Sequence, residues 1–148
     1  MMRYLFGGHA RSWLLIGLLA SLSACSKPID FTDYTIENLL KKNIEGLAEP
    51  AFFELREISI LSKQDEGERG SAEVYIYLYF ADDLASVAEK RQLSPDKMEY
   101  RQYESSFGNF AAGETQRHHA EYRFFRRDGK WYISGSRALS APVIQPSR

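Results

Sequence analysis

The chain has 148 residues, of which 44% are hydrophobic and 26% charged, and its formal net charge is −1. This length suits one domain. A balanced charge without a basic tract excludes the electrostatic footprint of a nucleic-acid-binding protein. The only cysteine is Cys25, which excludes a disulfide bond within the chain.

The first 24 residues have the layout of a secretory signal peptide. Arg3 and Arg11 make the start basic, and residues 13–20 are apolar or glycine. The next segment, Leu22-Ser23-Ala24-Cys25, resembles the lipobox of bacterial prolipoproteins. The resemblance implies that a signal peptidase removes residues 1–24 after a diacylglycerol has been attached to the sulfur of Cys25.

The lipobox resemblance also implies a location. A lipid on Cys25 would hold the protein on the bacterial cell envelope. Ser26 stands where an aspartate would resemble an inner-membrane retention signal, so we expect the outer membrane, with the protein facing the periplasm. Two alternatives for this segment are a membrane-spanning helix, which needs about 20 apolar residues, and a buried free thiol at Cys25. Neither fits a short apolar stretch that ends in small residues before the cysteine.

Removal of residues 1–24 would take away two arginines and no acid, which changes the net charge to −3. Residues 25–32 would then form the lipidated cysteine and a tether, whose seven residues after Cys25 reach at most about 25 Å. We expect residues 33–148 to form one domain that opens with an amphipathic helix at 33–47, with Asp33 as N-cap. Its apolar stripe consists of Ile36, Leu39, Leu40, Ile44 and Leu47.

Two strands are expected at residues 52–62 and 72–80, with a charged loop at 63–70 between them. The apolar positions of the first strand change parity, which predicts a β-bulge near Arg56 and Glu57. The second strand alternates strictly. Its inward residues are Val74, Ile76, Leu78 and Phe80, and its outward residues are Tyr75, Tyr77 and Tyr79.

A helical insert is expected next, with one helix at residues 82–93. Ser94 and Pro95 offer an N-cap and a first-turn proline for a second short helix that runs towards residue 104. Residues 107–113 are expected to form a loop.

The chain then forms a predicted hairpin of residues 115–127 and 130–136, because Asp128-Gly129 is the signal for a two-residue type I′ turn. This turn places Arg126 opposite Trp131. It also divides the side chains between the two faces. Tyr122, Phe124, Trp131 and Ile133 share the inner face, and His119, Glu121, Arg123, Phe125 and Tyr132 share the outer face.

Together these elements predict an α+β fold, with one N-terminal amphipathic helix packed on a four-stranded antiparallel sheet and a helical insert between strands 2 and 3. The element order and the turn Asp128-Gly129-Lys130-Trp131 resemble the cystatin-like and NTF2-like small domains of bacterial lipoproteins. Those domains include enzymes, binding pockets and interaction modules, so the resemblance does not select a function.

We expect no enzymatic activity and no catalytic, cofactor or metal site. His118 and His119 are adjacent on a strand, point to opposite faces and therefore cannot form one metal site. Because Cys25 is assigned to the lipid, nucleophilic catalysis has no obvious carrier.

The candidate partner surface is a set of aromatic residues and an arginine on the outer face. It consists of Tyr75, Tyr77, Tyr79, Arg123, Phe125 and Tyr132. Tyr and Arg are enriched at interface hot spots, but the insert at 82–113 is long enough to cover this face instead.

We therefore expect a non-catalytic interaction or assembly module, held at the membrane by its lipid, that binds an envelope protein. The alternative is an NTF2-like small-molecule-binding or isomerase-type pocket. A pocket of that type needs an acid that points inward, and none of the inward strand residues named above is acidic.

Overall fold

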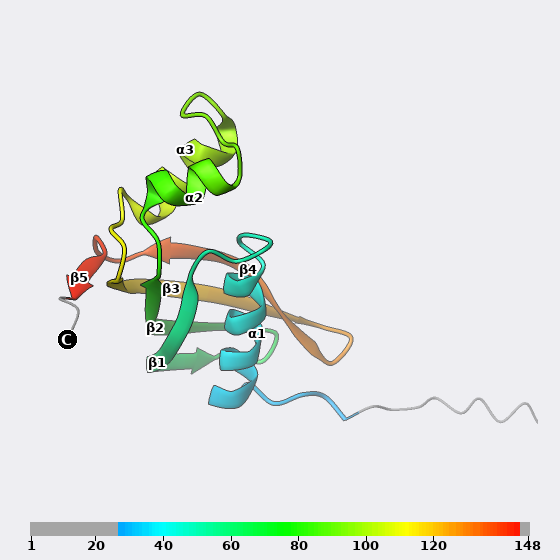
Figure 1. Ribbon diagram of the computed structural model, residues 1–148. Coiled ribbons are helices and arrows are strands. Elements are labelled where there is room, and N and C mark those ends of the chain that lie inside the picture. Colours follow the sequence, from blue (N-terminus) through cyan, green and yellow to red (C-terminus); the bar gives the residue numbers. More distant parts are fainter. Residues whose placement is uncertain (1–26, 146–148) are drawn as a thin grey trace, which may run out of the picture.

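The computed structural model describes residues 27–145, so the expected signal peptide and Cys25 lie outside the described residues. The fold is α+β, as predicted, with four long antiparallel strands in the order β1-β2-β3-β4 and three helices (Figure 1). The elements are α1 (Asp33–Glu45), β1 (Glu54–Asp65), β2 (Arg69–Phe80), α2 (Leu84–Lys90), α3 (Met98–Phe107), β3 (Glu114–Arg127), β4 (Lys130–Ala138) and β5 (Val143–Gln145). The short β5, which was not predicted, pairs with the start of β3.

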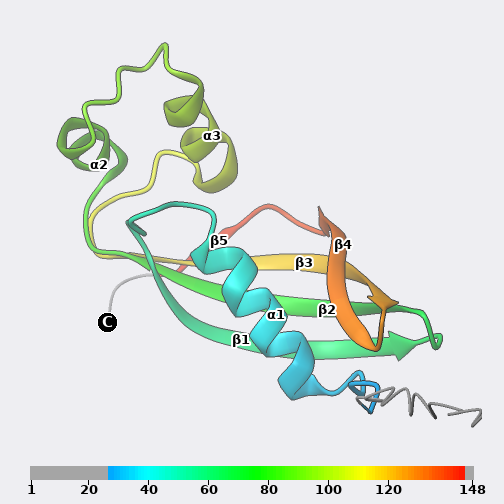
Figure 2. The ribbon, with the colours of Figure 1, turned by 90° about the vertical axis from the view of Figure 1, so that its right-hand side faces the viewer.

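The helix α1 lies across one face of the sheet, which we call the inner face (Figure 2). Ile36, Leu40 and Ile44 are buried there because they follow one another at helical spacing. The helix ends at Glu45, two residues earlier than predicted, and Leu47 is exposed.

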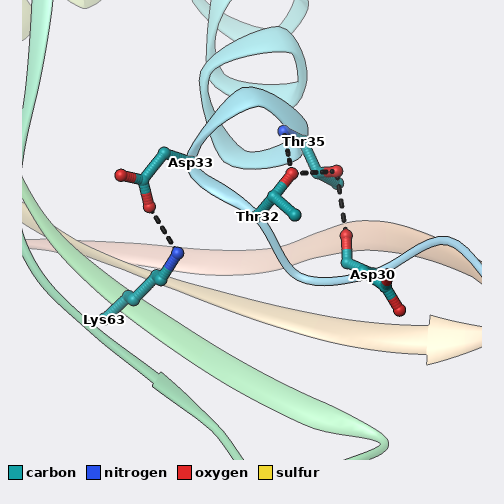
Figure 3. A network of polar contacts seen from close by, with 5 residues as sticks. All are labelled: Asp30, Thr32, Asp33, Thr35 and Lys63. Carbon is teal, nitrogen blue, oxygen red and sulfur yellow. Dashed lines mark hydrogen bonds and ion pairs between the residues drawn. The ribbon is translucent and has the colours of Figure 1, made fainter.

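The prediction of Asp33 as N-cap is wrong. Thr32 has the extended conformation of a cap, and its hydroxyl accepts a hydrogen bond from the Thr35 amide at 3.2 Å (Figure 3). Asp33 is the first helical residue, where the helix dipole favours an acid, and its carboxylate pairs with Lys63 of β1 (Figure 3).

The segment before α1 is part of the domain from Pro28 onward, although it was expected to belong to a tether. Phe31 is 6% exposed, and its ring lies 5.2 Å from that of Phe124 and 4.5 Å from that of Trp131. A ring buried between α1 and the hairpin fixes the path of the chain into the helix.

The predicted loop at 63–70 is mostly wrong, because β1 and β2 continue through it. Asp65 pairs with Gly70, and the turn closes with a hydrogen bond from the Glu66 amide to the Arg69 carbonyl. Charged residues were assigned to a loop, but β1 is an edge strand, and edge strands carry charged side chains.

The predicted bulge in β1 is confirmed by a register shift between Leu55 and Glu57, and a second shift lies between Ile60 and Ser62. The strict alternation of β2 is also confirmed, since buried and half-buried residues alternate along the strand to Phe80.

The helices of the insert stand beyond the end of the sheet where β2 ends and β3 begins (Figure 2). Asp83 caps α2 by accepting a hydrogen bond from the Ser86 amide at 2.7 Å. The predicted start of the second helix at Ser94 is wrong. The Lys97 amide donates to the Ser94 carbonyl at 2.9 Å, so Pro95 occupies the second position of a turn and α3 begins afterwards.

An aromatic cluster joins the insert to the sheet. The ring of Phe80 stacks on that of Phe110 at 4.2 Å, and Phe107 lies 5.6 Å from Phe80. Phe52 and Phe53, which precede β1, contact the same cluster instead of forming the start of the strand. Because Phe110 is fully buried, the expected loop at 107–113 contributes to the core.

The predicted hairpin is confirmed at its turn. Asp128 and Gly129 have φ values of 52° and 73°, as a type I′ turn requires, and Arg126 pairs with Trp131. A register shift between Arg123 and Phe124, which was not predicted, displaces the pairs further from the turn.

Candidate functional site

The outer face of the sheet carries the six residues of the predicted partner surface. Cross-strand pairs share a face, and the register places Tyr75 opposite His119 and Phe125 opposite Tyr132. The six residues form two groups, because Phe125 pairs with Arg69, six residues before Tyr75. At about 3.3 Å per residue, Phe125 lies about 20 Å from Tyr75 along the sheet, and Arg123, which pairs with Ser71, lies about 13 Å from it. We call the group Tyr75, Tyr77 and Tyr79 the tyrosine row.

Within the described part of the chain, no helix lies over the outer face (Figures 1 and 2). The insert contacts the inner face instead, since Phe107 of α3 lies 6.1 Å from the ring of His118. The interpretation that residues 82–113 cover the tyrosines is therefore wrong.

Neighbouring side chains on the sheet half-bury the tyrosine row. The guanidinium of Arg56 lies 4.5 Å above the ring of Tyr79, and that of Arg117 lies 4.5 Å above the ring of Tyr75. Cation–π contacts of this kind hold the arginines flat against the face. Beside them, Nε2 of His119 lies 2.7 Å from a carboxylate oxygen of Glu73. The row is thus an aromatic surface bordered by cations.

The inner face holds a second candidate site, which the sequence analysis missed. Glu114, Gln116 and His118 pair with the inward residues Phe80, Leu78 and Ile76, so all three point inward. Counting back in steps of two from the inward Phe124 along β3 would have identified them. The inward positions assigned from the sequence contain no acid, but that set was incomplete, because Glu114 lies opposite the inward Phe80.

These three side chains form a chain of hydrogen bonds. Nε2 of Gln116 donates to the Phe107 carbonyl and to Glu114 Oε1, both at 2.7 Å. The amide oxygen of Gln116 must therefore face His118, whose Nε2 lies 2.8 Å away. Since an amide oxygen only accepts, His118 carries its proton on Nε2 and its Nδ1 is an acceptor whenever the ring is neutral.

Burial sets the protonation of two groups on this face. It lowers the pKa of His118 below the ordinary value of 6.5, so the ring is neutral at pH 7. It raises the pKa of Tyr122 above 10, so the phenol keeps its proton. The inner face therefore presents a neutral imidazole acceptor and a neutral phenol.

A half-open cavity of about 830 Å³ lies against this chain of hydrogen bonds. The start of β3 and the ends of α1 and α3 form its walls, and the connection from β4 to β5 completes them. Its lining includes Ile44, Leu47, Glu104, Phe107, Gln116, His118, Tyr122, Leu139, Pro142 and Ile144. Leu47, Leu139 and Ile144 are exposed, so apolar surface surrounds a polar interior.

Among residues 27–145, no group of three or more His, Cys, Asp or Glu side chains is arranged to hold a metal ion. No helix in the same part of the chain has the length and hydropathy needed to cross a bilayer. No protein-family model, curated protein or solved structure matches the chain.

Proposed function

We propose that this protein is a lipoprotein of the bacterial envelope, anchored through Cys25 to the outer membrane and facing the periplasm. Its domain, with a leading helix on an antiparallel sheet and a helical insert, would act as a non-catalytic interaction module. The resemblance of the lipobox at residues 22–25 supports the anchor, and the resemblance to cystatin-like and NTF2-like domains is part of the same proposal.

The uncovered tyrosine row is the observation that supports a partner surface. Strand neighbours half-bury the three rings, and among residues 27–145 no helix lies over them. Tyr with Arg is the composition of interface hot spots. Tyr77 lies at the centre of the row, and the arginines over Tyr75 and Tyr79 border it. We propose that an envelope protein binds here.

The anchor is tested by metabolic labelling with a clickable palmitate. Wild-type protein should be labelled and processed, and Cys25→Ala should remain an unlabelled precursor. Ser26→Ala is the matched control and should be labelled like the wild type. Equal labelling of Cys25→Ala would place the lipid elsewhere and contradict the proposal.

The partner surface is tested by affinity capture from detergent-solubilised envelope. A partner should be captured by the wild type and lost with Tyr77→Ala. Tyr34→Ala removes a tyrosine that is 75% exposed on α1 and serves as the control, which should capture the partner normally. If both variants capture the same proteins as the wild type, the tyrosine row is not the binding site.

A second function, the binding of a small molecule, is favoured by the inward chain Glu114–Gln116–His118. A buried polar group is costly unless it has partners, and here Gln116 is 3% exposed and orients His118 beside a cavity. The cavity would take a neutral molecule with an apolar body and one hydrogen-bond donor, which the Nδ1 atom of His118 would accept. We propose no reaction step in it.

This second function is tested with phenol and cyclohexanol as probes in two-dimensional NMR. Saturable shifts should appear at the side-chain amide of Gln116 and at His118, and be absent at Thr115 and Arg117 on the outer face. His118→Phe removes the acceptor and should weaken the binding of both probes. Shifts of equal size on both faces would mean non-specific binding and exclude this site.

A further inference from the structure

The segment that leads into α1 is tied to the tip of the β3–β4 hairpin. We call residues 28–32 the strap. The Ile29 amide donates to the Gly129 carbonyl at 2.9 Å, and the Ile29 carbonyl accepts a hydrogen bond from Trp131 Nε1, also at 2.9 Å. Both backbone groups of one strap residue are therefore bound to the hairpin.

The strap is held at its other end as well. The Thr35 hydroxyl donates to the Asp30 carbonyl at 2.9 Å, which joins the strap to the first turn of α1 (Figure 3). The ring of Phe31 lies directly over Gly70, where an added Cβ would come within 2.7 Å of it. Close packing against a glycine, together with the hydrogen bonds of Ile29, holds the strap against the hairpin and α1.

The length of chain before the strap is short. Pro28 follows Cys25 by three residues, which span at most about 11 Å when fully extended. The turn at Gly129 is in van der Waals range of Pro28, since a Cβ placed on Gly129 would lie 3.4 Å from the Pro28 Cα. A lipid on Cys25 therefore brings the hairpin tip to the surface of the bilayer.

The two ends of the sheet are thus unequal with respect to the anchor. The hairpin turn and the start of α1 lie at one end, and α2 and α3 lie at the other (Figure 2). The cavity is lined by the end of α3 and the connection to β5, so it belongs to the far end.

We propose that the strap fixes the orientation of the domain on the membrane, with the hairpin end against phospholipid headgroups and with the insert and the cavity away from them. This inference rests on the proposed lipidation of Cys25. The surface in contact with lipid includes Arg127 and Lys130 at the tip, whose cations suit phosphate groups. Asp128, whose carboxylate lies 4.0 Å from Arg127, and Glu66 and Glu68 of the neighbouring turn offset these cations, so the orientation comes from the strap and not from net charge.

The experiment measures which end of the domain is near lipid. Azidophenylalanine incorporated at Lys130 or at Gln102 of α3 is coupled to a fluorophore, and the lipidated protein is reconstituted in phosphatidylcholine vesicles that contain a headgroup-linked quencher. We expect quenching at position 130 to exceed that at position 102 several-fold, and the ratio to be the same in 0.5 M salt. Equal quenching at the two positions would overturn the inference.

Two further proteins complete the design. In one, twelve Gly and Ser residues inserted after Lys27 lengthen the tether to about 20 Å on average and leave the strap intact; the ratio of quenching should approach one. In the other, a form that begins at Cys25 is coupled through this single cysteine to a maleimide phospholipid. This form measures orientation even if the cell does not lipidate the protein, and it should give the same high ratio as the native lipoprotein.

The experiment distinguishes failure of the proposed lipid anchor from failure of the proposed orientation. If the proposed anchor is wrong, the protein made in cells carries no lipid, but the maleimide-coupled form still reports a quenching ratio. If the coupled form attaches to vesicles and its ratio is one, the strap does not orient the domain, whatever the fate of Cys25 in the cell.

Discussion

Both faces of the sheet carry aromatic side chains, and the faces differ in what lies over them. On the inner face, Phe124 and Trp131 are buried against Phe31, and Phe80 is buried under the aromatic residues of the insert. On the outer face, within residues 27–145, side chains of neighbouring strands border the tyrosine row and no helix lies over it. Residue type therefore does not determine burial in this sheet; the covering helices and the strap do.

The inner face also changes along β3. The second half of β3 places apolar side chains on the inner face, where the strap packs on them. The first half of β3 places polar side chains there, next to the cavity. A polar inward residue is tolerated only where each of its groups finds a partner, and Gln116 meets that condition through three hydrogen bonds.

The largest effect should come from the covered aromatic residue of the hairpin. Trp131→Ala should lower the free energy of unfolding by about 3–5 kcal/mol, because a buried ring is removed and Phe31 loses its neighbour. Denaturant unfolding of a soluble form that starts at Ser26 measures it. Tyr132→Ala, one residue away on the outer face, is the control and should cost far less. A loss below about 1 kcal/mol for Trp131→Ala would contradict the packing of the strap.

The Gln116→Met variant tests the contribution of the polar half of the inner face to stability. It keeps the size of the side chain and removes its hydrogen bonds. We expect a loss of about 1–3 kcal/mol, since the buried carbonyl of Phe107 is left without a partner. Thr115→Val on the outer face is the matched control. A Gln116→Met variant as stable as the wild type would show that water replaces the amide and that the site is open to solvent.

The pH dependence of stability tests the burial of His118. Its pKa is lowered in the folded protein because burial disfavours the charged ring. The unfolded chain therefore binds more protons below pH 6.5, and the free energy of unfolding should fall as the pH drops through this value. Denaturant midpoints between pH 7.5 and pH 5 should decline less steeply in His118→Gln than in the wild type. Parallel declines would mean that this ring titrates as if exposed.

Much of the sheet was predictable because its signals are local. The turn residues Asp128 and Gly129 set the hairpin register, and strict alternation identified the two faces of β2. The same alternation, followed to the start of β3, would have revealed Gln116 and His118 on the inner face.

The positions of the insert and the strap were not predictable, because they depend on contacts between distant parts of the chain. Phe52 and Phe110 meet across 58 positions of sequence, at a ring distance of 5.6 Å, and no periodicity records such a contact. The hydrogen bond from Trp131 to Ile29 spans 102 positions, and no sequence pattern predicts it either. These distant contacts determine where the insert packs, and therefore whether it covers the tyrosine row.

The smallest effect should come from the uncovered face. Tyr77→Ala should cost about 1 kcal/mol, the range of strand preference at a half-buried position, because no helix among the described residues packs on the ring. Under a covering insert the same change would cost as much as Trp131→Ala, so the ratio of the two losses measures the difference between the faces directly. Denaturant unfolding of both variants in one buffer provides it, and Tyr77→Phe, which keeps the ring, should match the wild type. If Tyr77→Ala unfolds as early as Trp131→Ala, the outer face is covered in solution and the partner surface proposed on it must be abandoned.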